Sequence, residues 1–470
     1  MKLSLILVFF SFFLNLKSQN FYFSEPVDIS RDLQHKIIGK FQKYTLLFAQ
    51  QRNKNVIYTF DDSLKLLKTT EISFLKYNAN PLMIISDKNY WSLIVFYIEK
   101  GKTIIELNRF DEDANLLEQK KLAVFDERYN FDADQLIISD NKKNLAIYQF
   151  KSEAELDLLT INLSNLDTIF TKKYYWKSIN FYEELREIKI DNQANTYFIF
   201  EQNKQRRKLP KHRFLIYKID SLAKETNVII NVPNTSLQEL KTVIDEKNNQ
   251  LILAGFISDN TASNAFFYAR IDNNNNQYIY KINTMNEAFI RNFTGIERKK
   301  VNRIYNLKIK ELILRQDAGL IMITEETIVK NYELILNNTN SQAQVLGNQA
   351  DYFYGNLLIT SFHPTGDIHF NQIFYKNQDS ENDKARFSSF FMFKTPFFIK
   401  LLCNSDIILN PPIYEFQFNA IGETKKQLLT PQFEKDTQLE FKEGLQTNSN
   451  EAFTYTIKNN KLRLVRIFYP

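Results

Sequence analysis

Cysteine is almost missing from this chain of 470 residues, because Cys403 is the only one. A single cysteine excludes an internal disulfide, so the stability of the fold has to come from packing. Cys403 ends the apolar segment 397–403, which has the pattern of a strand. We therefore expect an inert, buried thiol rather than a reactive one.

Glycine, proline and histidine are also scarce, with ten, ten and four residues. Asn and Asp can form turns by bonding to their own backbone, so they are expected, together with Lys, at most turn positions. The few histidines and the absence of a Gly-x-Ser-x-Gly sequence leave little basis for a Ser–His–Asp hydrolase.

Long apolar runs are absent after the N-terminus, so no later segment is expected to span a membrane. At the N-terminus, Lys2 precedes an apolar run over 3–16, which is shorter than the ~20 residues of a spanning helix. Such a run is typical of a secretory signal peptide, with a buried first strand as the alternative. We predict a signal peptide over 1–19, cleaved after Ser18 or Gln19, and an exported protein that is periplasmic, on the outer surface or secreted.

Aromatic residues are plentiful, with 41 Phe and 24 Tyr, and aromatic side chains favour half-buried strands. One unit recurs along the chain: an apolar strand ends at Asn or Asp, turns within a few positions and continues as another strand. The Asn or Asp lies at positions 61, 111, 162, 220 and 272, with spacings of 50, 51, 58 and 52 residues. Degraded copies end at His363 and Asn419. A regular period of strand-only units with this spacing predicts a β-propeller.

Each unit holds four strands between turn signals, as expected for a propeller blade. Seven full units and a shorter tail are recognised. The units cover about 34–74, 81–122, 135–174, 184–232, 240–282, 307–374 and 384–431, and the tail strands cover 438–441, 452–457 and 461–468.

The three tail strands need a fourth strand to complete a blade, and either 20–24 or 26–29 near the N-terminus can supply it. Closing a ring in this way protects the sheet edges from association. We therefore predict an all-β propeller of eight four-stranded blades in one domain over 20–470, with seven blades as the alternative. The sixth unit carries an insertion around 325–355, which we interpret as a long surface loop. A row of sandwich domains fits less well, because each sandwich needs about 100 residues.

A further pattern follows the insertion: a strand, a Pro-x-Gly turn and a second strand over Leu357–Ile368. With this pattern and the repeated units, the chain resembles the uncharacterised, secreted β-propeller proteins of the Bacteroidetes envelope. The resemblance covers almost the whole chain after the signal peptide, and it implies a propeller fold without a known activity. The Tyr-Trp-Thr-Asp and Trp-Asp signatures of other propeller families are missing.

Two motifs have some of the residues of a metal site but lack further ligands. The segment 111–115 starts like a calcium loop, yet leucines occupy the positions of the required Gly and Glu. His363 and His369 flank a turn beside Asp367, without a clear further ligand. We interpret both as ordinary turns between strands, and we predict no metal and no cofactor.

Carboxylates at the axial mouth offer a route to an enzyme, since a glycosidase needs two of them ~5–10 Å apart. Asp and Glu are abundant, so their presence alone indicates little. A carbohydrate-active hydrolase is therefore the alternative rather than the main prediction. The candidates near expected starts of inner strands, or beside their turns, are Asp134, Glu183, Asp191 and Asp245.

Basic residues are concentrated over 204–213, between the second and third strands of the fourth unit, and again over 298–303. The net charge of +6 permits contact with acidic polymers, and Arg binds phosphate or carboxylate through two parallel hydrogen bonds. The alternative is a solvated loop whose charge discourages stray strand pairing. The residues that we predict to bind a ligand are Arg206, Arg207, Lys208, Lys211 and Arg213.

We predict a binding or scaffolding module of the cell envelope rather than an enzyme, with loops that present charge on a rigid ring. The expected partner is an acidic glycan, a lipid headgroup or an envelope protein, and nucleic acid is not expected. Trp91 and Trp176 could stack on sugars, but their strand surroundings favour burial between blades. An axial pocket with two facing carboxylates and aromatic walls would indicate the hydrolase, whereas mixed walls would indicate the binding module.

Overall fold

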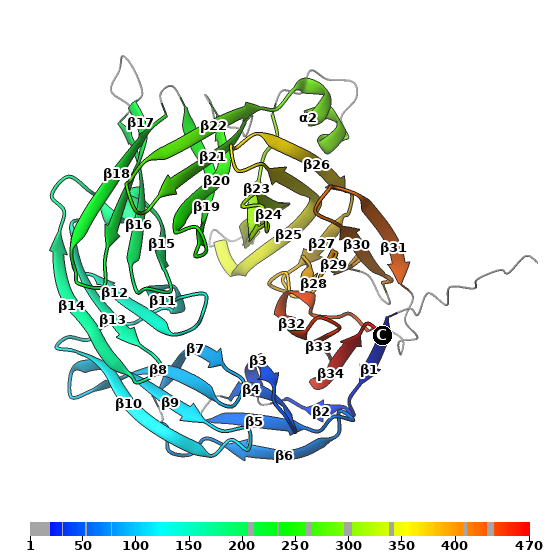
Figure 1. Ribbon diagram of the computed structural model, residues 1–470. Helices are drawn as coiled ribbons and strands as arrows, with labels where there is room; N and C mark the ends of the chain where they lie inside the picture. Colours follow the sequence, from blue (N-terminus) through cyan, green and yellow to red (C-terminus); the bar gives the residue numbers. More distant parts are fainter. Residues whose placement is uncertain are drawn as a thin grey trace, which may run out of the picture.

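The computed structural model describes residues 19–30, 32–51, 54–76, 78–204, 211–232, 235–258, 265–295, 303–337, 343–407, 411–429 and 437–470. Residues 1–18, with nearly all of the predicted signal peptide, lie outside this range. Within the described residues the strands form eight sheets around one axis, as the view along that axis in Figure 1 shows. The all-β, eight-bladed propeller predicted from the repeat is confirmed.

Seven blades consist of consecutive strands, with the first strand beside the axis and the last at the rim. The first four contain β3 (Asp32–Lys40), β4 (Thr45–Gln51), β5 (Asn55–Phe60), β6 (Leu66–Glu71); β7 (Asn80–Ser86), β8 (Trp91–Glu99), β9 (Lys102–Phe110), β10 (Leu116–Phe125); β11 (Leu136–Ile138), β12 (Asn144–Phe150), β13 (Glu155–Asn162), β14 (Asp167–Tyr175); and β15 (Leu185–Ile190), β16 (Thr196–Lys204), β17 (Lys211–Ile219), β18 (Glu225–Asn231). The next three contain β19 (Ser236–Asp245), β20 (Gln250–Ser258), β21 (Ala265–Asp272), β22 (Tyr278–Thr284); β23 (Leu307–Leu314), β24 (Leu320–Asn337), β25 (Ala343–Phe362), β26 (Ile368–Phe374), β27 (Gln378–Glu381); and β28 (Phe391–Lys394), β29 (Ile399–Asn404), β30 (Ile413–Phe418), β31 (Thr424–Leu429).

The eighth blade is built from both ends of the chain. Asn20 lies opposite Phe468 and Val27 opposite Leu462, so both N-terminal segments proposed from the sequence pair with the last strand. This pairing closes the ring as predicted. The strands of this blade are β32 (Leu445–Asn448), β33 (Glu451–Lys458), β34 (Lys461–Phe468), β1 (Asn20–Phe23) and the short β2 (Val27–Asp28).

One tail strand of the sequence analysis is wrong. The segment 438–441 is not a strand, and β32 takes its place beside the axis. Leu439 and Phe441 are fully buried between the seventh and eighth blades, so their apolar pattern comes from core packing.

Short helices occur only between blades in the described part of the chain, and none of them is long and apolar enough to cross a membrane. They are η1 (Ala133–Gln135), α1 (Phe181–Glu184), α2 (Glu287–Thr294) and η2 (Phe441–Glu443).

The Asp residues that mark the repeat close turns between the third and fourth strands. Asp61 Oδ1 accepts hydrogen bonds of 2.9 Å from the backbone N–H groups of Ser63 and Lys65. Asp111 and Asp220 hold their turns in the same way. A side chain that satisfies its own turn replaces the glycine that this chain lacks.

The second and third strands of a blade carry its core. Seven of the nine residues of β8 and eight of the nine of β20 are buried, whereas β22 at the rim is mostly exposed. Strands beside the axis, such as β19, have mixed burial because they end the sheet and no further strand pairs with their inner edge. The most continuous apolar runs therefore mark the middle of a blade and not its inner edge.

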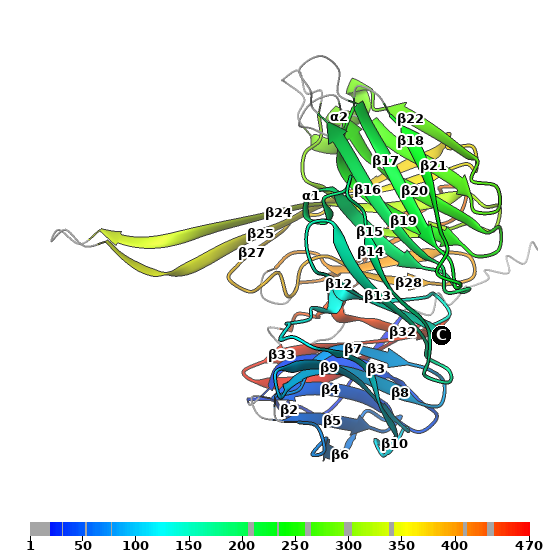
Figure 2. The ribbon, with the colours of Figure 1, turned by 90° about the vertical axis from the view of Figure 1, so that its left-hand side faces the viewer.

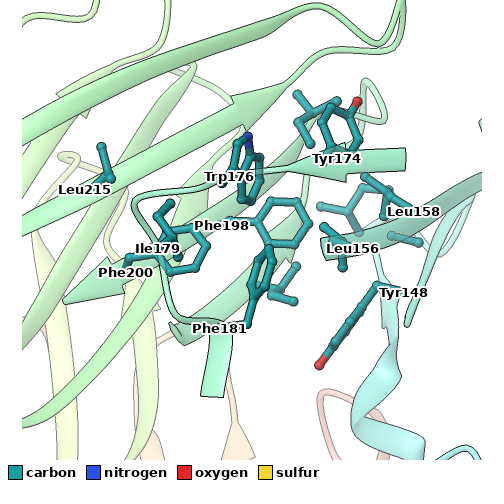
Figure 3. Packing of buried hydrophobic residues seen from close by; sticks show 14 of the residues in the cluster. Tyr148, Leu156, Leu158, Tyr174, Trp176, Ile179, Phe181, Phe198, Phe200 and Leu215 are labelled. Carbon is teal, nitrogen blue, oxygen red and sulfur yellow. The ribbon is translucent and has the colours of Figure 1, made fainter. Parts of the chain in front are cut away.

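Apolar side chains of adjacent blades interlock, and both tryptophans take part. Trp176 stacks on Tyr217 with a centroid distance of 4.4 Å and lies against Phe198 in the cluster of Figure 3. Trp91 is fully buried and stacks on Phe110 at 4.2 Å. The predicted burial of both tryptophans is confirmed, as is that of Cys403, whose pKa burial raises to about 12.

The sixth blade carries an arm. β24 and β25 continue beyond the blade as a two-stranded ribbon that projects from one face of the ring in Figure 2, with β27 paired at its root. The sequence predicts a surface loop around 325–355, and this is wrong, since the strands remain paired from Leu320 and Phe362 out to Asn337 and Ala343. We call the face from which the ribbon projects the arm face.

Candidate functional site

A cavity of about 640 Å³ opens where the innermost strands β3 and β7 begin. Neighbouring strands are antiparallel, so the first strand of a blade begins on the side where the second ends, which is the arm face. The other walls are the segments 383–386 before β28 and 440–443 before β32, and these strands surround the middle of the ring in Figure 1. The volume is within the ~300–1,000 Å³ of small-molecule sites. We call it the mouth cavity.

Glu440 is the most perturbed carboxyl group of the mouth cavity. Its side chain is 5% exposed and forms an ion pair with the more open guanidinium of Arg386. Burial raises the pKa of Glu440 to about 7, although the charge of Arg386 acts in the opposite direction. A carboxyl group that titrates near neutral pH can exchange a proton with a ligand or substrate.

Tyr455 and His35 continue this polar wall. Burial, and then the charge of Glu440, raises the pKa of Tyr455, so its hydroxyl stays protonated. The ring of His35 meets that of Tyr455 edge-on, with a centroid distance of 6.1 Å. Basic side chains outnumber carboxylates by five to three around the mouth cavity: His35, Lys36, Lys384, Arg386 and Lys442 against Asp383, Glu440 and Glu443.

The remaining wall is apolar. Strand β7 contributes four consecutive half-buried residues, Pro81, Leu82, Met83 and Ile84. The lining of the mouth cavity is therefore mixed, with charged groups and an apolar strip.

Charged side chains elsewhere along the axis bind one another. On β15, Lys189 Nζ lies 2.9 Å from Glu187 Oε1, and Glu187 also accepts two hydrogen bonds from Thr242 of β19. Between β19 and β23, Lys308 Nζ lies 2.8 Å from Glu239 Oε2. These contacts join the inner strands of neighbouring blades.

The predicted basic site is described only in part. Arg213 is described, and its Nε donates a hydrogen bond of 2.8 Å to Gln202 Oε1 on the paired strand. The binding role of the basic segment stays a prediction. Outside the described residues lie Arg206, Arg207, Lys208, the side chain of Lys211, and residues 298–300 of the second basic cluster.

The carboxylates proposed from the sequence are divided between the two faces of the ring. Glu183 precedes β15 and Asp191 follows it, so they lie at opposite ends of one strand. Asp191 and Asp245 both hold turns on the face opposite the arm, where they accept hydrogen bonds from Asn195 and Asn248. None of the four lines the mouth cavity: Asp134, Glu183, Asp191 and Asp245.

His363 and His369 do face each other, with a centroid distance of 4.7 Å. Arg315 Nη1 lies 2.7 Å from His369 Nδ1, and burial together with this cation lowers the pKa of His369. A guanidinium in this position competes with any added cation. Across the described ranges, no three His, Cys, Asp or Glu side chains are arranged to hold a metal ion.

The sequence analysis missed Arg386 and Glu440. The available signal was the acidic residue between Leu439 and Phe441, in a segment that we took for a strand. A carboxyl group between two buried apolar residues is itself expected to be buried. A buried carboxyl group has to form an ion pair or be protonated, and such groups are rare in proteins.

Comparison with known proteins finds only distant similarities, to solved structures. No family model and no curated protein matches the chain. Solved structures that resemble it include the polysaccharide lyase Uly1, with 9% identity and a TM-score of 0.40 over 95% of this chain and 99% of that one. An uncharacterised protein from Listeria monocytogenes EGD-e has 8% identity and a TM-score of 0.42 over 82% and 93%. The β-propeller domain of the Trilobed protease from Pyrococcus furiosus has 10% identity and a TM-score of 0.38 over 86% and 97%. These similarities carry no argument about activity.

Proposed function

We propose that this propeller is an exported binding module of the cell envelope that holds an acidic oligosaccharide in the mouth cavity. The observation that carries the proposal is the lining: a surplus of basic side chains next to the apolar strip of β7. A sugar acid presents C–H groups to an apolar wall and a carboxylate to a cation, so one ligand satisfies both walls.

Three lysines of the mouth cavity are available to such a ligand. Lys36, Lys384 and Lys442 are exposed, and no described carboxylate lies within ion-pair distance of them. Arg386, in contrast, is held by Glu440. The lysines therefore supply positive charge that no carboxylate among the described residues neutralises in an ion pair.

The position of the basic segment and the apolar N-terminal run support the same function. β16 ends and β17 begins on the arm face, so the basic segment between them starts and finishes on the face of the mouth cavity. The apolar run over 3–16 supports export, which brings the protein to envelope glycans.

A hydrolase is the second candidate. Glu440, with a pKa raised to about 7, and Glu443 line the same cavity, and a general acid with such a pKa suits glycoside cleavage. Phe48 and Tyr455 also line the cavity, but they lie beside the aliphatic strip of β7 and charged side chains, and such mixed walls favour the binding module.

Titration calorimetry with a tetramer of galacturonic acid, and with the neutral galactose tetramer, tests the proposal. We expect the acidic tetramer to bind more tightly, and K384S/K442S to weaken it about tenfold, because two exposed charge pairs are worth ~0.2–1 kcal/mol each. K88S/K394S removes the same charge from the opposite face, at the ends of β7 and β28, and should leave binding unchanged.

Equal affinity for both tetramers, or equal loss in the two double variants, would contradict the binding module. If the wild type cleaves the tetramer and releases new reducing ends, and Glu440→Gln does not, the protein is a hydrolase and the proposal of a binding module is wrong.

A further inference from the structure

The root of the arm forms a three-stranded surface with two rows of side chains. Residues directly opposite each other in paired strands share a face, which places Ile328, Phe353 and Asp379 in one row. The next row, two positions further from the ring, consists of Lys330, Asp351 and Glu381. Figure 2 shows β27 lying along this root.

This surface lines a groove of about 920 Å³, which we call the arm-root groove. Phe387, Ile407 and Gln438 form its other side. Ile328, Phe353 and Ile407 are half-buried, so part of their apolar surface faces the groove. The apolar residues lie near the ring and the charged row lies further out along the arm.

The arm-root groove is acidic on a chain whose net charge is +6. Four carboxylates, those of Asp351, Asp379, Glu381 and Asp383, line it with a single amine, Lys330, so the lining carries 1 − 4 = −3. Tyr332, Ser380 and the Ala385 N–H donate hydrogen bonds to two of these carboxylates, but these donors are neutral. No described Lys or Arg forms an ion pair with any of the four.

The groove rests on a rigid base. Just beneath it, Lys376 Nζ donates to Tyr354 O at 3.0 Å and to Gln378 Oε1 at 2.9 Å, and all three residues are buried. Gln378 begins β27, so this network fixes the strand that carries Asp379 and Glu381. A binding site that is already rigid in the free protein loses little conformational entropy when a partner binds.

We propose that the arm-root groove docks an extended segment of another protein that has an apolar residue and, two positions away, a Lys or Arg. Alternate residues of an extended chain point to the same side, about 7 Å apart, which is the separation of the two rows of the groove. The apolar residue meets Ile328 and Phe353, and the cation meets Asp351 and Glu381. Charge complementarity with the four unpaired carboxylates selects a basic partner.

The test uses the full chain after residue 19 and a fluorescein-labelled nonapeptide. The odd positions of this peptide are leucine and lysine in alternation, and all of its even positions are serine. A second peptide has glutamate at each lysine position. Fluorescence polarisation should detect the lysine peptide and not the glutamate peptide. We expect D379N/E381Q to weaken binding at least tenfold, and Ile407→Ser to weaken it through the apolar wall.

The matched control is D140N/E246Q, which removes two carboxylates from turns on the opposite face. It should bind the lysine peptide like the wild type. Asp383 is left unchanged because it also lines the mouth cavity, so D379N/E381Q should bind the galacturonic acid tetramer normally and the two proposals are tested apart.

Equal binding of the two peptides, or equal losses in both double variants, would overturn the proposal. Light scattering gives a further outcome. If the wild type has the mass of a dimer and D379N/E381Q has the mass of a monomer, the groove binds a second copy of this chain. That result would overturn the proposal that the groove docks another protein.

Discussion

Glu440 shows how two neighbouring residues set the chemistry of a third. Leu439 and Phe441 are fully buried, and they keep water from the carboxyl group between them. The folded protein therefore favours the protonated form, and the pKa rises from 4.5 to about 7. Because the pKa is raised on folding, the folded state binds more protons than the unfolded chain at pH values between about 4.5 and 7. The stability that Glu440 contributes is complete below pH 4.5 and is lost as the pH rises through about 7.

Glu440→Gln should remove this pH dependence, because the amide does not titrate. We expect the difference in unfolding free energy between wild type and variant to change by about 3 kcal/mol from pH 5 to pH 8, at ~1.4 kcal/mol per pKa unit. Chemical denaturation at the two pH values measures it. A difference that stays constant with pH would contradict the buried acid.

Residues of this kind mark the limit of sequence reasoning. Asp61 could be predicted as a turn residue because its partners, Ser63 and Lys65, follow within four positions. Glu440 and Arg386 are 54 positions apart, about one repeat, and the packing of the seventh blade against the eighth brings them together. The closed ring also gathers the mouth cavity from segments of four blades, the first, second, seventh and eighth, so none of its walls has a local signature.

The arm depends on a buried charge network at its root. Glu325 is fully buried, and its carboxylate lies 2.8 Å from Lys376 Nζ and 3.0 Å from Lys310 Nζ. Lys376 has no exposed side-chain surface, whereas Lys310 reaches water. Without Lys376, the buried carboxylate keeps only the partly solvated Lys310 as a cation, so much of its desolvation penalty is no longer offset.

Lys376→Met should therefore lower the unfolding free energy by about 3–5 kcal/mol, the usual effect of breaking a buried ion pair. Replacing both partners, as E325L/K376M, should restore much of this loss, since no buried charge then remains unpaired. Chemical denaturation of the wild type and the three variants, with Glu325→Leu as the third, completes a double-mutant cycle. Additive losses in the double variant would show that the two side chains are not coupled.

The arm also explains the largest error at the scale of elements. Beyond the short β27, β24 and β25 pair only with each other, so no neighbouring strand or blade imposes a core pattern on their sequence. Val329 and Tyr332 are exposed for this reason. A repeat recognised from its blades therefore predicts an inserted loop at the ribbon, whereas strands that pack between blades, such as β20, keep the apolar pattern from which the repeat was recognised.

The number of blades was predictable because a blade needs four strands. The C-terminal tail was expected to have three, and the N-terminus had a strand that belonged to no other blade. β1 joins β34 through four residue pairs, and Ser24 exchanges two hydrogen bonds of 2.9 Å with Leu464. Phe21 and Phe23 pack against the cluster between the seventh and eighth blades. β1 thus both covers the edge of β34 and extends the core.

A chain that starts at Glu25 should therefore be less stable than one that starts at Gln19. We expect a loss of about 3 kcal/mol, at ~1.5–3 kcal/mol for each large apolar side chain that is fully buried, and association through the uncovered edge of β34. F21A/F23A is the control, because it keeps the backbone pairs and should lose stability without association.

Chemical denaturation and light scattering of these chains measure both effects. Made with residues 1–19 in an exporting host, the mature protein should begin at Gln19 or Asn20 by mass spectrometry, which leaves β1 whole. A mature chain that begins after Phe23 would contradict the signal peptide and the closure together, because export would then remove the strand that completes the ring.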